Sequence, residues 1–178
     1  LGGIGDGGMI ATNNKKYFET ITQLKNHGLK NSKHKIVGIN SRLDSLNAFV
    51  LNEKLKIFHN ISKTRNDFYK YYVDNLSDCN FIKLPKKENS NILLNYFTIS
   101  INKNLRNKLM DYLKINGIST SIYYKTPVHQ LPALSFMNKS FKLDKTVIAS
   151  KTVLSLPLYP FAKKSEMERV VKKILNFS

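Results

Sequence analysis

Hydrophobic residues near the start of the chain recur at the spacing of a helix. Phe18, Ile21 and Leu24 fall on one helical face, and Gly28 follows them as a C-terminal stop signal. This pattern predicts a helix over about residues 14–27.

Other local signals surround this helix. Residues 1–8 form a glycine-rich loop, residues 9–12 are predicted as a short strand, and residues 29–38 are basic and loop-like. From Ser41 the apolar spacing is again helical, and we expect a helical run to about Val73. Its apolar positions include Leu43, Leu46, Val50 and Ile57.

The second half of the chain alternates between strand and helix patterns. A polar connection with Pro85 and Lys86-Lys87 precedes it and is a candidate domain boundary by composition. We expect strands over residues 92–101, 118–124 and 154–156, and helices over residues 104–116, 143–151 and the C-terminal stretch with Val170, Val171 and Ile174. Ser165 and Glu168 have the spacing of a capping box for the last helix. The alternation predicts a small α/β unit.

The chain has 178 residues, about one domain's worth, and a net charge of +17 from 29 Lys+Arg against 12 Asp+Glu. This excess fits a polyanionic partner such as nucleic acid, or an anionic small-molecule substrate. It also fits a general excess of lysine, and we favour that interpretation because phosphate and base recognition depends on arginine forks. The arginines are few and scattered: Arg42, Arg65, Arg106 and Arg169.

Several site classes are not supported by the residue pattern. The apolar runs are too short for a membrane span, and a single cysteine, Cys79, forms no intrachain disulfide and fits a cytoplasmic protein. No metal site is expected, because the histidines lack ligand spacing. They are His27, His34, His59 and His129.

Residues 3–8 satisfy the G-x-G-x-x-G pattern. A dinucleotide-binding fingerprint must follow a strand and open a helix, whereas here no strand precedes the glycines and a predicted strand follows them. We therefore reject a dinucleotide site. Two interpretations remain: the glycines permit close approach of another group, or they form a flexible start of the chain.

Asn40 and Arg42 lie where the second helical pattern begins. A helix N-terminus with a nearby arginine is suited to binding phosphate. The alternative is that Asn40 or Ser41 only caps the helix, and from these residues alone a cap is the better interpretation.

Two phenols and an imidazole follow the predicted strand over residues 118–124. Tyr123, Tyr124 and His129 therefore come from a strand end, a common place for ligands in α/β units. An amphipathic strand with one ring in the core and one outside explains the tyrosines equally well.

Together and in this order, these stretches resemble the C-terminal part of the DegT/DnrJ/EryC1/StrS family of sugar aminotransferases, fold type I enzymes that use pyridoxal 5′-phosphate (PLP). The matching stretches are residues 1–8, 12–13, 26–28, 38–46, 117–118, 122–124, 127–129 and 155–158. The resemblance implies an α/β fold, with a C-terminal remnant of the large PLP-binding domain over residues 1–57 and a small C-terminal α/β domain over residues 58–178.

The resemblance also implies the roles of individual residues. The lysine that forms the Schiff base with PLP would stand two residues upstream of Leu1, so this chain carries no catalytic residue of its own and should not transaminate alone. Asn40 would reach the PLP phosphate of the other subunit of a homodimer, with Arg42 at the same junction. The nucleotide-sugar side would be lined by Tyr123, Tyr124 and His129.

By the same resemblance, the intact enzyme would move an amino group from glutamate to a keto sugar carried on a nucleotide, for polysaccharide or lipopolysaccharide synthesis. Asn47, where the family more often has glutamine, and residues 95–97, where a Gln-Tyr pair is commoner, leave the substrate open. Two alternatives stay in place. One is a basic nucleic-acid-binding module, and the other is a non-catalytic partner of a separate N-terminal polypeptide.

Overall fold

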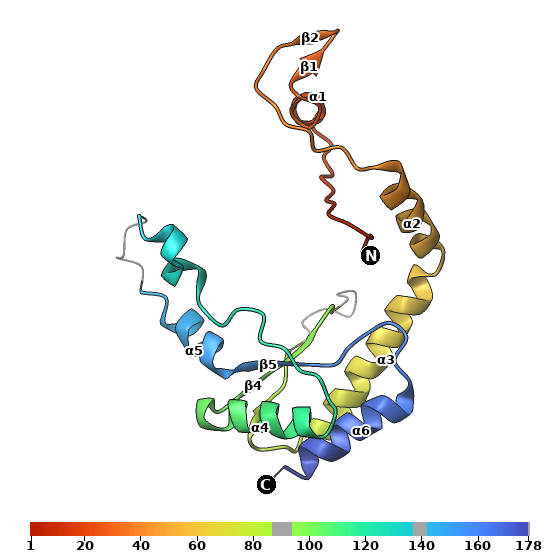
Figure 1. The fold of residues 1–178 in the computed structure, drawn as a ribbon. Helices are drawn as coiled ribbons and strands as arrows, with labels where there is room; N and C mark the ends of the chain where they lie inside the picture. Colours follow the sequence, from red (N-terminus) through yellow and green to blue (C-terminus); the bar gives the residue numbers. More distant parts are fainter. Residues whose placement is uncertain (87–93, 137–141, 178) are drawn as a thin grey trace. The chain divides into compact units, whose positions relative to one another are not determined.

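The structure is a computed structural model that describes residues 1–86, 94–136 and 142–177. The chain divides into two compact units, residues 1–59 and residues 60–178, with the division near the start of one long helix, α3 (Figure 1). None of the helices in these described ranges has the length and apolar character needed to cross a membrane.

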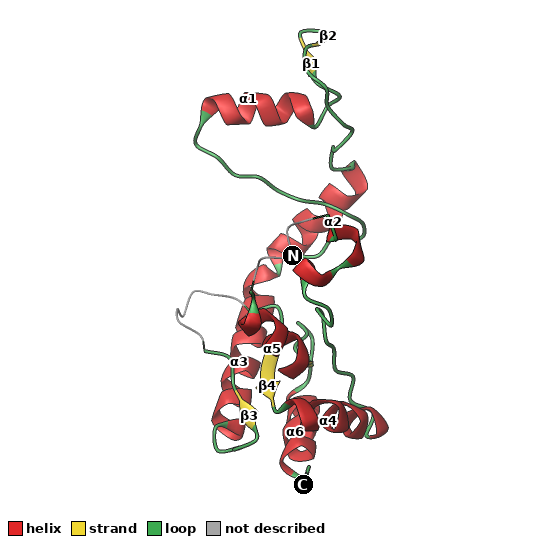
Figure 2. Cartoon of the chain, turned by 90° about the vertical axis from the view of Figure 1, so that its left-hand side faces the viewer, coloured by secondary structure: helices red, strands yellow, loops and turns green. Residues whose placement is uncertain are grey.

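The first unit consists of two helices, a small hairpin and connecting loops, as Figure 2 shows. Its elements are α1 (Lys15–Leu24), β1 (Leu29–Lys30), β2 (Lys33–His34) and α2 (Ser45–Lys56). Asn14 caps α1, because its side-chain oxygen accepts a hydrogen bond from the Tyr17 N–H. The predicted helix over residues 14–27 is therefore confirmed but ends earlier.

Residues 24–28 are joined to residues 36–41 by backbone hydrogen bonds. The Ile39 N–H donates to the Leu24 carbonyl at 2.9 Å, and the His27 N–H donates to the Ile39 carbonyl at 3.0 Å. A Cβ at Gly28 would lie 1.7 Å from the Ile36 carbonyl oxygen, and Gly28 has φ +72°. Only glycine fits this position, because the two backbone segments are too close for a side chain and because residue 28 has a left-handed conformation.

The prediction of a plain loop over residues 29–38 is wrong. β1 and β2 pair antiparallel, and the connecting Asn31 and Ser32 have φ of 50° and 61°. Positive φ at both central residues is typical of a type I′ turn, which closes two-residue hairpins. Asn-Ser is a weaker signal for this turn than Asn-Gly.

Two further expectations for the first unit are corrected. Residues 9–12 form no strand, because within the described unit no second strand pairs with them. Helix α2 begins at Ser45 and not at Ser41, since the Asp44 carboxylate accepts the Asn47 N–H at 2.7 Å and caps the helix there. Asn40 and Ser41 therefore do not cap it.

The second unit combines three strands with helices. Its elements are α3 (Phe58–Leu76, with its first two residues in the first unit), β3 (Ile82–Lys83), β4 (Phe97–Ile101), α4 (Lys103–Ile115), the short 3₁₀ helices η1 (Val128–Gln130) and η2 (Pro132–Leu134), α5 (Asp144–Thr152), β5 (Val153–Leu156) and α6 (Lys164–Leu175). The strands form one antiparallel sheet in the order β3-β4-β5. The expected α/β unit is therefore confirmed.

One hydrophobic core joins the sheet to α3, α4 and α6. Phe97, Ile99 and Ile101 alternate along β4 and are all buried, because successive side chains of a strand point to opposite faces. The helices add apolar residues at helical spacing. These are Phe68, Tyr72 and Leu76 from α3, Leu109 and Leu113 from α4, and Met167, Val170, Val171 and Ile174 from α6.

Four details of the second half differ from the expectation. Residues 118–124 form only an isolated bridge between Ser121 and Ser155. The last helix is capped two residues earlier than predicted, where the Lys163 N–H donates to the Glu166 carboxylate at 2.6 Å. The Pro85 connection is not a unit boundary, because β3 before it pairs with β4 after it. Of the strand predicted over residues 92–101, residues 92 and 93 lie outside the described residues, residues 94–96 are not in a strand, and β4 supplies the last five.

Candidate functional site

Asn40 and Arg42 are brought together in the first unit. Asn40 forms a β-bridge with Asn26, and the Ser41 N–H donates to the Lys25 carbonyl at 2.9 Å, so residues directly after α1 hold this segment. The Arg42 Nε donates to the Asn40 Oδ1 at 3.1 Å.

This hydrogen bond orients two groups that donate to anions. Among the described residues, the Asn40 amide nitrogen and the terminal guanidinium nitrogens of Arg42 have no hydrogen-bond partner, and both side chains are exposed. A planar guanidinium next to an amide N–H₂ matches the oxygens of a phosphate. The pair thus carries donors of the kind that bind phosphate, but Asn40 lies four residues before the Asp44 cap and not at a helix N-terminus.

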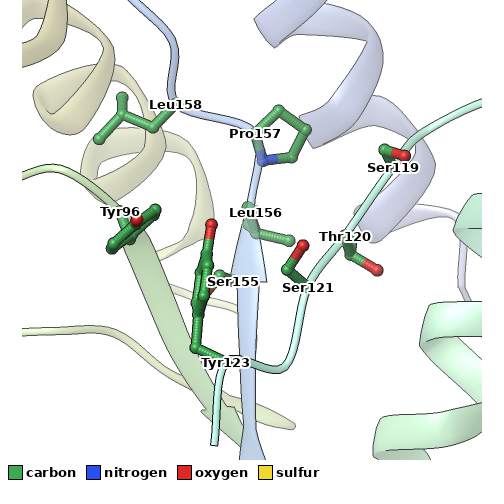
Figure 3. A pocket seen from close by; sticks show the side chains of 9 residues that line it. All are labelled: Tyr96, Ser119, Thr120, Ser121, Tyr123, Ser155, Leu156, Pro157 and Leu158. Atoms are coloured by element: carbon green, nitrogen blue, oxygen red, sulfur yellow. The ribbon is translucent and has the colours of Figure 1, made fainter. Parts of the chain in front are cut away.

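A pocket in the second unit contains Tyr123. Figure 3 shows the rings of Tyr123 and Tyr96 side by side at one wall, and their centroids are 4.1 Å apart at an interplanar angle of 43°. The remaining wall carries hydroxyl groups and the end of β5. The lining residues are Tyr96, Ser119, Thr120, Ser121, Tyr123, Ser155, Leu156, Pro157 and Leu158.

Backbone pairing positions Tyr123. Ser121 and Ser155 exchange two backbone hydrogen bonds, of 3.1 Å and 2.8 Å, so the chain leaves β5 two residues before Tyr123. Partial burial raises the pKa of the Tyr123 phenol, and its hydrogen bond with Tyr96 raises it further. The Tyr123 phenol is therefore a neutral hydrogen-bonding group at pH 7.

Tyr124 and His129 do not line this pocket. Tyr124 is 73% exposed, and His129 is half-buried in η1. The structure thus joins Tyr123 to Tyr96 rather than to the other two predicted residues. Nor do His, Cys, Asp and Glu side chains of the described ranges form a group of three or more that could hold a metal ion.

The pocket has supports that sequence reasoning did not find. The Tyr72 hydroxyl donates to the carbonyl of Pro157 at 2.9 Å, and Arg65 Nη1 donates to Asn95 Oδ1 at 2.9 Å, next to Tyr96. These pairs are 85 and 30 residues apart. Side-chain bonds to partners this distant have no local sequence signal.

Known proteins with this fold define its class. NtdA from Bacillus subtilis, solved with its cofactor PMP bound, superposes with a TM-score of 0.82 at 26% identity, over 93% of this chain and 40% of that one. PMP is the amino form of PLP. The fold is therefore that of the C-terminal part of a PLP-dependent aminotransferase of fold type I, as the family resemblance implied.

The chain belongs to the DegT/DnrJ/EryC1/StrS aminotransferase family, whose model matches residues 2–175. It is 32% identical over 182 residues to a pleiotropic regulatory protein of Geobacillus stearothermophilus. It is 32% identical over 177 residues to the UDP-2-acetamido-2-deoxy-3-oxo-D-glucuronate aminotransferase of Pseudomonas aeruginosa. Each match covers 99% of this chain but 48% of the relative, so the chain spans about half the length of these proteins.

Proposed function

We propose that this chain supplies the C-terminal half of a PLP-dependent aminotransferase that acts on a nucleotide-linked keto sugar. The observation that carries the proposal is the family match over residues 2–175. The activity of the Pseudomonas aeruginosa relative on a UDP-linked 3-oxo sugar indicates the substrate class. The amino donor is glutamate, and the product serves polysaccharide or lipopolysaccharide synthesis in the cytoplasm, where the free thiol of Cys79 stays reduced.

In this proposal residues 1–57 are the end of the large PLP-binding domain and residues 58–178 are the small domain. The division of the chain after His59 supports this assignment. A second support is that every buried hydrophobic side chain of the described residues belongs to the second unit, from Ile61 to Ile174. The first unit has no hydrophobic core of its own, as expected for part of a larger domain.

The chain's own residues bind and orient. Asn40 and Arg42 hold the phosphate of PLP, which in the homodimer belongs to the other subunit's site. Tyr123 faces the nucleotide sugar from the pocket of the second unit, where the Tyr96–Tyr123 pair offers an aromatic wall and hydroxyl groups. Tyr124 and His129 do not line this pocket, so the family resemblance alone assigns them to the sugar side. When bound, PLP supplies the carbonyl that carries the amino group and the electron sink for proton transfer at the substrate carbon.

This 178-residue polypeptide alone does not transaminate, because its lysines do not include one at the family's Schiff-base position. No lysine lines the pocket of the second unit. The test is to incubate the chain with PLP, reduce with borohydride and map the modified lysines by mass spectrometry. We expect low, scattered labelling of surface lysines. Stoichiometric modification of a single lysine would contradict the proposal.

A further inference from the structure

Asn47 is a buried amide in a unit without buried hydrophobic side chains among its described residues. It lies in the first turn of α2 and is 1% exposed. Burying a side-chain amide is unfavourable unless its oxygen and nitrogen are hydrogen-bonded. Its partners therefore indicate what the residue does.

Both polar ends of Asn47 bind the glycine-rich segment, residues 2–7. The Ile4 N–H donates to Asn47 Oδ1 at 3.1 Å, and Asn47 Nδ2 donates to the Asp6 carbonyl at 3.3 Å. The amide contacts Gly3 so closely that a Cβ there would lie 2.1 Å from Asn47 Oδ1. Gly3 is thus required by this contact and not by a free chain end.

A second contact, two turns further along α2, shows in which direction the glycine-rich segment runs along the helix. Lys54 Nζ donates to the Gly2 carbonyl, and residues 47 and 54 lie on the same face of α2 because seven residues complete about two turns. At the other end, a Cβ on Gly7 would lie 3.2 Å from the Leu43 side chain. The segment therefore runs along α2 opposite to the helix direction, with Gly2 toward the C-terminal end of the helix.

We infer that Asn47 is a positioning residue: it holds residues 3–6 on α2 and so sets the point at which the chain ahead of Leu1 leaves this helix. The consequence of this positioning for PLP rests on the proposed function, because the resemblance puts the PLP-binding lysine two residues ahead of Leu1. An apolar side chain at position 47 would pack but could not bind both backbone groups. The amide is what fixes the segment.

The test uses the 178-residue chain and does not require activity. Hydrogen exchange of the Ile4 amide is measured by NMR, and a nitroxide on Leu1→Cys reports motion next to the upstream junction; buried Cys79 stays unlabelled. In Asn47→Ala we expect Ile4 exchange to rise about tenfold or more and the label to become more mobile. Asn47→Gln should restore much of both readouts, and Asn52→Ala, exposed on the same helix, should change neither.

Gly3→Ala separates positioning from folding if Asn47→Ala loses helix α2. Its Cβ displaces the segment from Asn47 while leaving the helix sequence intact, so Ile4 exchange and label motion should rise with unchanged far-UV circular dichroism. Wild-type exchange and label motion in Asn47→Ala or Gly3→Ala would overturn the inference. Stoichiometric trapping of PLP on one lysine of the chain would instead overturn the proposed function, and the two failures are distinguishable.

Discussion

Tyr72→Phe removes one oxygen atom that connects the core to the pocket. Tyr72 is 0% exposed, its ring centroid lies 4.7 Å from that of Phe97, and its hydroxyl donates to the Pro157 carbonyl at 2.9 Å. Phenylalanine keeps the ring packing and leaves this carbonyl without that donor. Loss of a buried hydrogen bond of this kind costs about 1–3 kcal/mol, so the free energy of unfolding at pH 7 should fall by that amount.

The same hydroxyl makes the cost depend on pH. Burial raises the pKa of the Tyr72 phenol above its ordinary value of 10.0, with a smaller contribution from Tyr159. Above pH 10 the folded state therefore keeps the phenol proton that the unfolded state releases. The contribution of this phenol to stability is complete below pH 10 and is lost as the pH rises above it. At pH 11 the unfolded wild type gains about 1.4 kcal/mol from this ionisation, whereas Tyr72→Phe gains nothing.

Urea denaturation followed by circular dichroism, from pH 7 to pH 11, measures both effects. The stability difference between wild type and Tyr72→Phe should be constant up to about pH 9.5 and then shrink. Tyr124→Phe is the matched control, because Tyr124 is 73% exposed in the same unit. A difference that stays constant to pH 11 would refute the reasoning.

Three other predictions concern single features. In Gly28→Ala the new Cβ would lie 1.7 Å from the Ile36 carbonyl oxygen at a positive φ, so the free energy of unfolding should fall by more than about 1 kcal/mol. Hydrogen exchange over residues 24–40 should be faster in this variant. Gly5→Ala is the control and should leave this exchange unchanged, because the space around Gly5 is open. The Lys163 N–H lowers the pKa of the Glu166 carboxyl, so the stability that this carboxylate contributes is present above its ordinary pKa and is lost as the pH falls. Glu166→Gln should therefore be less stable than wild type at pH 7. In thermal unfolding measured at decreasing pH, this variant should lack that part of the loss of stability. The charge of +17 should give only weak duplex DNA binding that vanishes with salt, and tight binding at physiological salt in fluorescence polarisation would support the nucleic-acid alternative.

Hydrophobic periodicity predicted α3, α4 and α6 well, because each of these helices buries one apolar face. In α4, Leu109 and Leu113 are four residues apart and both fully buried, so their spacing alone marks the helix. The prediction of a strand over residues 118–124 was wrong, because β-branched residues indicate an extended backbone but do not show whether a neighbouring strand is there to pair with it. Only Ser121 finds one, on Ser155, and the chain then turns toward Tyr123.

The candidate site was predicted only in part, since its geometry depends on contacts between distant residues. Asn40 and Arg42 are two positions apart and do interact, so their proximity was readable from the sequence. Tyr96 and Tyr123 are far apart in sequence and meet because β4 and the bridge at Ser121 both pair with β5. No spacing rule in the sequence encodes such a meeting.

The two units differ in what specifies them, and this explains why the predictions of a loop, a strand and a helix start in the first unit failed. In the second unit a buried cluster of apolar side chains selects the fold, and hydropathy reports it. In the first unit the specifying contacts are backbone approaches at Gly3 and Gly28 and a buried amide at Asn47. The hydropathy pattern of the sequence indicates none of these three contacts. The identity of residue 47 therefore bears first on how the glycine-rich segment is held.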